Sequence, residues 1–121
     1  MSLIFDQKAA VVATANATPV DATSAAISIA EDKVGSVECV IVAKSGTSGK
    51  VWRLGCAFKR AVGGSAALIG TVQNLMAAQG DTALSSATAT LVASGGTIVP
   101  RLTGIAANIT WEVTTYGTVM Q

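Results

Sequence analysis

The chain has 121 residues, a formal net charge of +1, and a composition that is 50% hydrophobic but only 4% aromatic and 12% charged. This length suits one domain with a workable core, and the charged fraction is about half of the ~25% usual in soluble domains, which is typical of subunits of an oligomer or a larger assembly. A nearly neutral chain lacks the clustered basic face that nucleic-acid binding requires, so we expect no nucleic-acid partner.

Residues 1–20 contain a short apolar run after Lys8 that ends in Ala15-Asn16-Ala17. That order has a trace of a signal peptide, but Asp6 precedes the run and the run is weakly hydrophobic. We therefore interpret residues 1–20 as an N-terminal arm or edge strand, and residues 21–121 as one β-sandwich domain.

Alternation with a period of two predicts the next strands. Residues 23–30 (TSAAISIA) read as one short strand, and the runs 37–44 and 52–59 read as a hairpin with a four-residue loop at 46–49. This register places eight hydrophobic residues on one face, and a slip of one residue would break the match. They are Val37, Cys39, Ile41, Ala43, Trp52, Leu54, Cys56 and Phe58, with Trp52 opposite Ala43 and Cys56 opposite Cys39.

A second hairpin turns at Gly63-Gly64, because glycine adopts the positive φ that a tight turn demands. Its return strand is predicted over residues 65–72. Residues 73–82 (QNLMAAQGDT) are then the only plausible short helix or long loop. The run 61–80 has no charge, but Gln, Asn and Gly interrupt it too often for a membrane span, so we expect no membrane partner.

A third hairpin joins residues 86–94 to residues 97–103 through Gly95-Gly96. Pro100 lacks an N–H group, which favours an edge position or a bulge for its strand. A last strand follows, in which Ile109, Trp111 and Val113 alternate with Thr110, Glu112 and Thr114. About seven to eight short strands with Gly-rich turns predict an all-β fold, a single antiparallel β-sandwich or jelly-roll-like barrel.

The sequence offers little chemistry for catalysis. It contains no histidine and only two cysteines, so a Ser-His-Asp or Cys-His arrangement is impossible and a zinc site is improbable. Glu31-Asp32 is typical of a solvated turn, and residues 46–51 depart from a phosphate-binding loop because Val51 replaces the required Ser or Thr. We predict that the chain is not an enzyme, with no catalytic, metal-binding or cofactor-binding residues and no cofactor.

Three other features have a structural and a functional interpretation. Cys39 and Cys56 are interpreted as buried free thiols, with a cross-strand disulfide as the alternative. Trp52 and Trp111 are interpreted as core residues, with an aromatic sugar-binding platform as the alternative. Lys59 and Arg60 are adjacent on a strand, so they face apart and do not form a phosphate clamp.

From residue 51 to residue 111 the order of elements resembles a small β-rich module of tailed-bacteriophage virion surface proteins, found in capsid decoration or cement proteins and at the ends of tail fibres and head fibres. The strand W-x-L-x-x-x-F-K-R leads to a GG turn and A-A-L-I-G-T-V, and T-A-T-L-V-A-S-G-G-T-I-V-x-R-L-T-G follows. The best-matching residues are Trp52, Phe58, Arg60, Gly63, Leu68, Gly70, Gly95, Arg101, Gly104 and Trp111.

This resemblance implies a non-enzymatic structural virion protein. Because the chain has no shaft, coiled coil or collagen-like repeat, the resemblance implies a capsid decoration or cement protein that binds and stabilises the lattice of the phage major capsid protein. It further implies a homo-oligomer, best a homotrimer, made in the bacterial cytoplasm and placed on the capsid surface, with the N-terminal arm adding a strand to a neighbour. The alternative is a receptor-binding or glycan-binding fibre-tip or head-fibre module that uses exposed loops such as residues 45–50 and 73–82.

Overall fold

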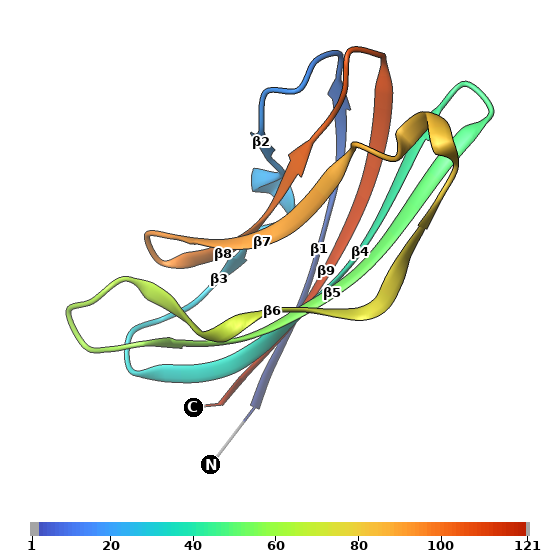
Figure 1. Cartoon of the computed structure of the whole chain (residues 1–121). Helices are drawn as coiled ribbons and strands as arrows, with labels where there is room; N and C mark the ends of the chain where they lie inside the picture. The colour runs from blue at the N-terminus through green and yellow to red at the C-terminus, as the bar shows by residue number, and fades with distance from the viewer. Residues whose placement is uncertain (1–2, 121) are drawn as a thin grey trace.

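The computed structural model describes residues 3–120, which form an all-β sandwich of two antiparallel sheets (Figure 1). The predicted fold class is therefore confirmed. The larger sheet has the order β1-β9-β4-β5-β6, with strands β1 (Leu3–Thr14), β4 (Lys33–Ser45), β5 (Ser48–Arg60), β6 (Ala66–Gly80) and β9 (Ile109–Met120). The smaller sheet has β8 (Thr97–Thr103) at its centre, paired with β7 (Thr88–Ser94) on one side and with β2 (Val20–Asp21) and β3 (Ile27–Ser28) on the other.

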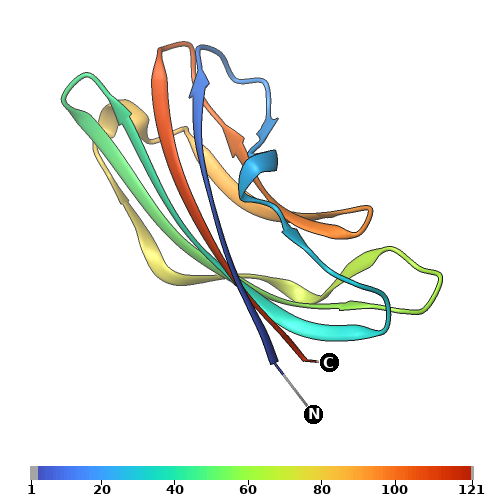
Figure 2. The ribbon, with the colours of Figure 1, turned by 180° about the vertical axis from the view of Figure 1, so that it is seen from behind.

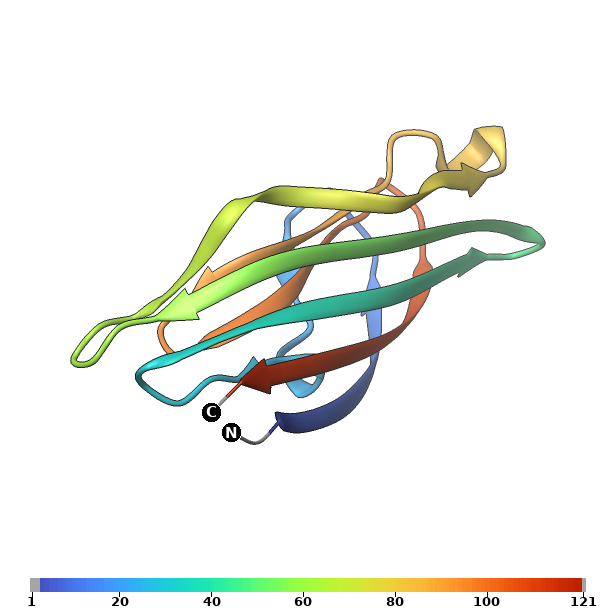
Figure 3. The ribbon, with the colours of Figure 1, turned by 90° about the horizontal axis from the view of Figure 1, so that it is seen from below.

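The long strands of the larger sheet curve around the smaller sheet, which lies on their concave side (Figures 1 and 2). Seen from below, the long strands of the larger sheet cross in front of the smaller sheet (Figure 3), and Leu3 pairs with Met120, so the first and last described residues lie side by side. The core fills the space between the sheets. Its largest fully buried side chains are Trp111, Phe58, Ile27, Ile29, Ile41, Leu54, Leu84, Leu91, Ile98, Leu102, Ile109 and Val37.

The hairpin of β4 and β5 has the predicted face but a different register. Ser45 pairs with Ser48, so the loop is two residues long, and Gly46 has a φ of 61° that suits the first position of a primed turn. The predicted four-residue loop is therefore wrong. Because the shift between the two registers is two residues, all eight hydrophobic residues still face the core, and all eight are buried.

The strand β6 is much longer than predicted. It continues to Gly80, so the predicted helix or loop at residues 73–82 is wrong, and the only helical turn there is η2 (Thr82–Leu84). Its C-terminal half pairs with Gly55 back to Lys50 on β5, which leaves β5 bonded on both sides. Register shifts between the two strands absorb their different lengths, and Gly70 has a φ of 77° there.

Two further predictions, for residues 23–30 and for the strand that contains Pro100, are wrong. Of the predicted strand 23–30, only Ile27–Ser28 forms a strand, and residues 23–25 form the turn η1 (Thr23–Ala25) instead. The strand that contains Pro100 is neither an edge nor bulged: β8 is paired on both sides without a register shift. Pro100 is tolerated because it falls between the positions paired with β2 and β3, where its carbonyl accepts a bond from the Ala22 amide.

The N-terminal segment is an integral strand of the larger sheet. Over Leu3–Thr14, β1 pairs with β9 residue by residue without a register shift, and it lies at the edge of the sheet. Of the expected residues 1–20, positions 1 and 2 lie outside the described residues. The strand uses Ala10, Val12 and Thr14 on its inner face, of which Ala10 and Val12 pack against the core.

Candidate functional site

The most distinctive surface of the molecule is the outer face of the larger sheet, the side turned away from the smaller sheet. We call it the outer sheet face. Eight large hydrophobic side chains are exposed among the described residues, and seven of them lie here, the exception being Val62 in the loop after β5. The seven are Phe5, Val11, Val34, Val42, Ile69, Leu75 and Met120. Large exposed apolar patches are typical of interaction sites.

The sequence of β4 explains how this face arises. Val40, Ile41 and Val42 are consecutive, so both faces of the strand carry β-branched side chains. Ile41 is fully buried in the core, while Val42 is exposed on the outer sheet face. A strand that is apolar on both faces is typical of a sheet that is covered on both sides. These three consecutive apolar residues were the signal in the sequence for the outer sheet face. They were not recognised, because only the alternating residues of the inner face were considered.

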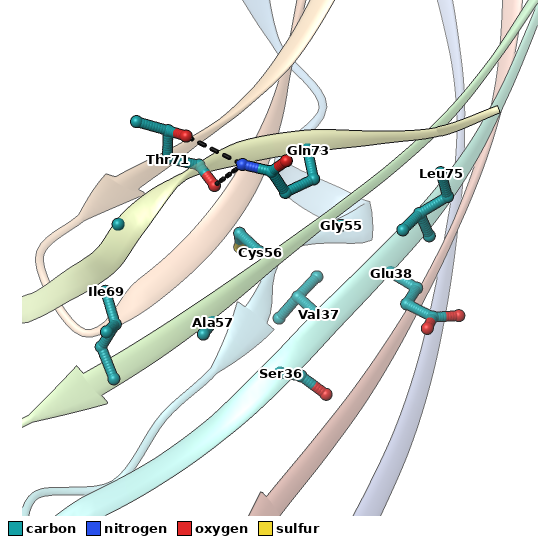
Figure 4. A pocket seen from close by; sticks show the side chains of 11 residues that line it. Ser36, Val37, Glu38, Gly55, Cys56, Ala57, Ile69, Thr71, Gln73 and Leu75 are labelled. Atoms are coloured by element: carbon teal, nitrogen blue, oxygen red, sulfur yellow. Dashed lines mark hydrogen bonds between the residues drawn. The ribbon is translucent and has the colours of Figure 1, made fainter. Parts of the chain in front are cut away.

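One hollow in the outer sheet face follows the irregular pairing of β5 and β6 (Figure 4). Gly55 pairs with Gln73 but Ala57 pairs with Ile69, so β6 bows away from β5 and leaves a groove of about 370 Å³. Leu75 lies over Gly55, where a Cβ atom would meet its side chain at 3.2 Å. The walls of the groove are mostly apolar, and Glu38 supplies its only charged side chain.

A second hollow of about 410 Å³ lies at the centre of the outer sheet face, between β1, β9, β4 and β5. Phe5 and Tyr116 form one wall, with ring centroids 6.4 Å apart. Glu38 and Arg53 line the hollow as well, and neither forms an ion pair with another described residue. We call this site the central hollow. Ser36, Val40 and Thr118 complete its lining.

The two cysteines are buried free thiols, as predicted, and the register separates them. Cys39 lies opposite Leu54, and Cys56 lies opposite Val37. Burial raises the pKa of Cys39 to about 12, an effect that the nearby Thr115 hydroxyl partly offsets and the neighbouring Cys56 slightly adds to. Burial also raises the pKa of Cys56. A thiol held in its neutral form is a poor nucleophile, so neither cysteine is equipped for catalysis.

Lys59 and Arg60 point to opposite faces of β5, as predicted from their adjacent positions. Lys59 is exposed on the outer side, whereas Arg60 is half-buried and bonds to main-chain carbonyls. Its guanidinium donates to the Gly64 carbonyl at 2.8 Å and to the Ile29 carbonyl at 2.7 Å. Arg60 therefore fixes the end of the sandwich and is not available to an anion.

The tryptophans belong to the core. Trp52 and Trp111 stack with their ring centroids 5.4 Å apart, and both are buried. The Trp111 indole N–H donates to the Thr14 hydroxyl at 2.9 Å. Lys50 lies over the Trp52 ring at 5.0 Å. The alternative of an exposed tryptophan platform is therefore wrong, and the aromatic pair on the outer sheet face is Phe5 with the half-buried Tyr116.

The two segments expected as exposed loops are brought together at one end of the molecule. Residues 45–50 are the tip of the β4–β5 hairpin, and residues 73–82 run along β6 to η2. The Gly49 amide donates to the Asp81 carboxylate at 2.8 Å, and the Asp81 amide donates to the Gly49 carbonyl at 2.9 Å. These bonds fasten the hairpin tip to the neighbouring strand.

Elsewhere, Glu31 and Asp32 form an exposed turn, as predicted, in which Asp32 has a φ of 61°.

Within residues 3–120, no group of three or more His, Cys, Asp or Glu side chains is placed to hold a metal ion. The same part of the chain has no helix that is long and apolar enough to cross a membrane. No protein-family model, curated protein or solved structure matches this chain. The interpretation of the site therefore depends on its own geometry.

Proposed function

We propose that this chain is a non-enzymatic structural protein of a bacteriophage virion, a capsid decoration or cement protein that binds and stabilises the lattice of the major capsid protein. The observation that supports this role is the outer sheet face, on which seven large apolar side chains from four strands are exposed. A docking protein needs such a surface because burial of apolar area is the main source of association free energy. The resemblance of residues 51–111 to a phage module supplies the kind of partner.

The first experiment measures copy number per virion on a quantitative gel. A decoration protein that covers a lattice is expected at hundreds of copies, whereas a few to a few dozen copies would contradict the proposal and indicate a fibre.

The second experiment adds the protein to shells that lack it. Val42→Asp places a charge in the outer sheet face and is expected to lower occupancy strongly, because burying an unpaired carboxylate opposes docking. Thr90→Asp on the exposed side of β7 is the matched control and is expected to bind as the parent protein does. Equal occupancy for both variants would exclude the outer sheet face as the docking surface.

A glycan-binding or receptor-binding module is the second candidate, and the central hollow is the observation that favours it. An aromatic ring can stack on the apolar face of a sugar, while a carboxylate and a guanidinium bond to its hydroxyl groups. The hollow combines the Phe5–Tyr116 pair with Glu38 and Arg53.

This second role predicts that the purified protein binds host cells or immobilised host glycans. Tyr116→Ala is expected to abolish that binding, and Val62→Ala, which changes an exposed residue away from the hollow, is expected to preserve it. No binding by the parent protein would exclude this role and leave the decoration proposal unaffected.

A further inference from the structure

The two edges of the larger sheet differ in how they are protected. The β6 edge is irregular, with three register shifts against β5 and a positive φ at Gly70. The Ala66 amide at its start also bonds to the Gly95 carbonyl of the smaller sheet, at 2.7 Å. Bulges and coverage of this kind prevent a sheet edge from pairing with another chain.

The β1 edge has no bulge, and the turn η1 packs against β1 without a backbone hydrogen bond to it among the described residues. All twelve residues of β1 pair in order with β9, and among the described residues no strand pairs with the other side of β1. Each unpaired N–H and C=O group along that side is available to a further strand. Two residues of β1, Phe5 and Val11, are also the most exposed large hydrophobic residues of the outer sheet face, at 65% and 73%.

The two charged residues of β1 favour pairing with a second copy of the same strand in one antiparallel register. Asp6 and Lys8 are the charged residues of this strand, and they lie two residues apart on its inner side. Their contact within one chain is 3.9 Å long between partly exposed groups, so it contributes little. A second copy of β1, antiparallel and centred on Gln7, places each Asp6 opposite a Lys8 of the other copy. Centring on Asp6 or Lys8 instead places like charges together, which is destabilising.

The same register also fits the side chains on the outer sheet face. Gln7 meets Gln7 of the second copy, where the two amides can bond to each other. Phe5 lies opposite Ala9, so the small residue leaves room for the ring. Because opposite residues of an antiparallel pair point to the same side, the outer sheet faces of the two copies become one continuous surface.

We propose that the free edge of β1 is a pairing site for a second copy of this chain, with the two β1 strands antiparallel about a two-fold axis at Gln7. The result is a ten-stranded sheet that runs through both molecules. This proposal is independent of the virion role, and it differs from the trimer that the family resemblance implies.

Mass in solution gives the first test. Light scattering over a dilution series is expected to show twice the chain mass of 12.1 kDa. A single-chain mass at every concentration, or a mass of three chains, would overturn the proposal.

Cross-linking tests the register. Gln7→Cys places two thiols opposite each other, within reach of a disulfide, and oxidation is expected to convert most of the protein to a covalent dimer. Ala9→Cys is the matched control on the same face, because in this register its two copies are four residues apart along the strand, roughly 13 Å. The native cysteines do not compete, since both are buried. Equal cross-linking of the two variants, or none in either, would overturn the proposed register.

Charge reversal tests the partner. Lys8→Asp turns two opposite-charge pairs into like-charge pairs and is expected to raise the dissociation constant of the dimer about tenfold. The double variant Asp6→Lys with Lys8→Asp restores the opposite pairing and is expected to restore the affinity of the parent. Circular dichroism confirms that each variant is folded. A double variant as weak as the single variant would show that these charges do not meet, and would overturn the proposal.

Discussion

The two faces of the larger sheet differ in composition and in what covers them: the inner face is almost wholly apolar, whereas the outer sheet face mixes exposed apolar side chains with charged ones such as Glu38 and Arg53. On the inner face, Trp111, Phe58 and Ile41 are fully buried beneath the smaller sheet. On the outer sheet face, Val42 and Ile69 have similar chemistry but remain exposed. Exposed apolar side chains that gather on one face of a sheet are typical of an interaction surface. The comparison indicates that the outer sheet face is a surface for a partner.

One glycine on each face of the larger sheet shows the same difference in its contacts. Gly117 on the inner face lies against Ile27 of the smaller sheet, where a Cβ atom would approach the Ile27 Cγ2 atom to 2.7 Å. Gly55 on the outer sheet face lies beneath Leu75, an exposed side chain that can move. The inner glycine therefore sets the spacing of two sheets, whereas the outer one contacts a single flexible residue.

The largest effect is expected for the buried tryptophan. Trp111→Ala removes a fully buried ring that stacks on Trp52 and bonds to Thr14, and it is expected to lower the free energy of unfolding by about 3–5 kcal/mol. Tyr116→Ala, on the same strand but facing outward, is expected to cost about 1 kcal/mol or less. Urea denaturation of the two variants measures the difference. Similar losses would mean that the outer ring contributes to the fold as the inner ring does.

A smaller effect is expected for the inner glycine. Gly117→Ala forces the Ile27 side chain and the smaller sheet outward and is expected to cost about 1–3 kcal/mol. Gly55→Ala is the matched control, and it is expected to be neutral or slightly stabilising because glycine weakens a strand interior. The midpoints of thermal unfolding give the comparison. If Gly117→Ala proved neutral, the spacing of the sheets would not depend on this contact.

Effects of similar or smaller size are expected for two buried threonines on the inner face, and they have opposite signs. The Thr115 hydroxyl is buried beside the Cys39 thiol and makes no well-formed hydrogen bond, so Thr115→Val is expected to stabilise the protein by about 1 kcal/mol or less. Thr14→Val leaves the Trp111 indole N–H unpaired and is expected to destabilise it by about 1–3 kcal/mol. Urea denaturation provides both values. A loss of stability in Thr115→Val would show that its hydroxyl has a bonding role in the core.

Most features that depend on residues close together in the sequence were predicted correctly, and features that depend on distant residues were not. The faces of β4, β5 and β9 were predicted correctly, because alternation along one strand fixes which side chains share a face. The register of the first hairpin was wrong by two residues, because a loop of four residues and a turn of two preserve the same alternation. The length of β6 was also missed, since residues 73–80 are extended by their pairing with β5 and have no strand pattern of their own.

The candidate site was harder to predict than the fold. The central hollow joins Phe5 at the start of the chain to Tyr116 near its end, through the pairing of β1 with β9. No local pattern links two residues that are so far apart in the sequence.

Period-two alternation and turn glycines were enough to predict an all-β fold whose tryptophans and cysteines belong to the core, with a sandwich and a jelly-roll-like barrel both left open. Only the folded arrangement shows that β1 lies at a regular edge of the larger sheet and that the apolar residues of four strands, β1, β4, β6 and β9, meet on one exposed face. Those properties depend on strand order, and strand order is fixed by pairing between segments distant in the chain.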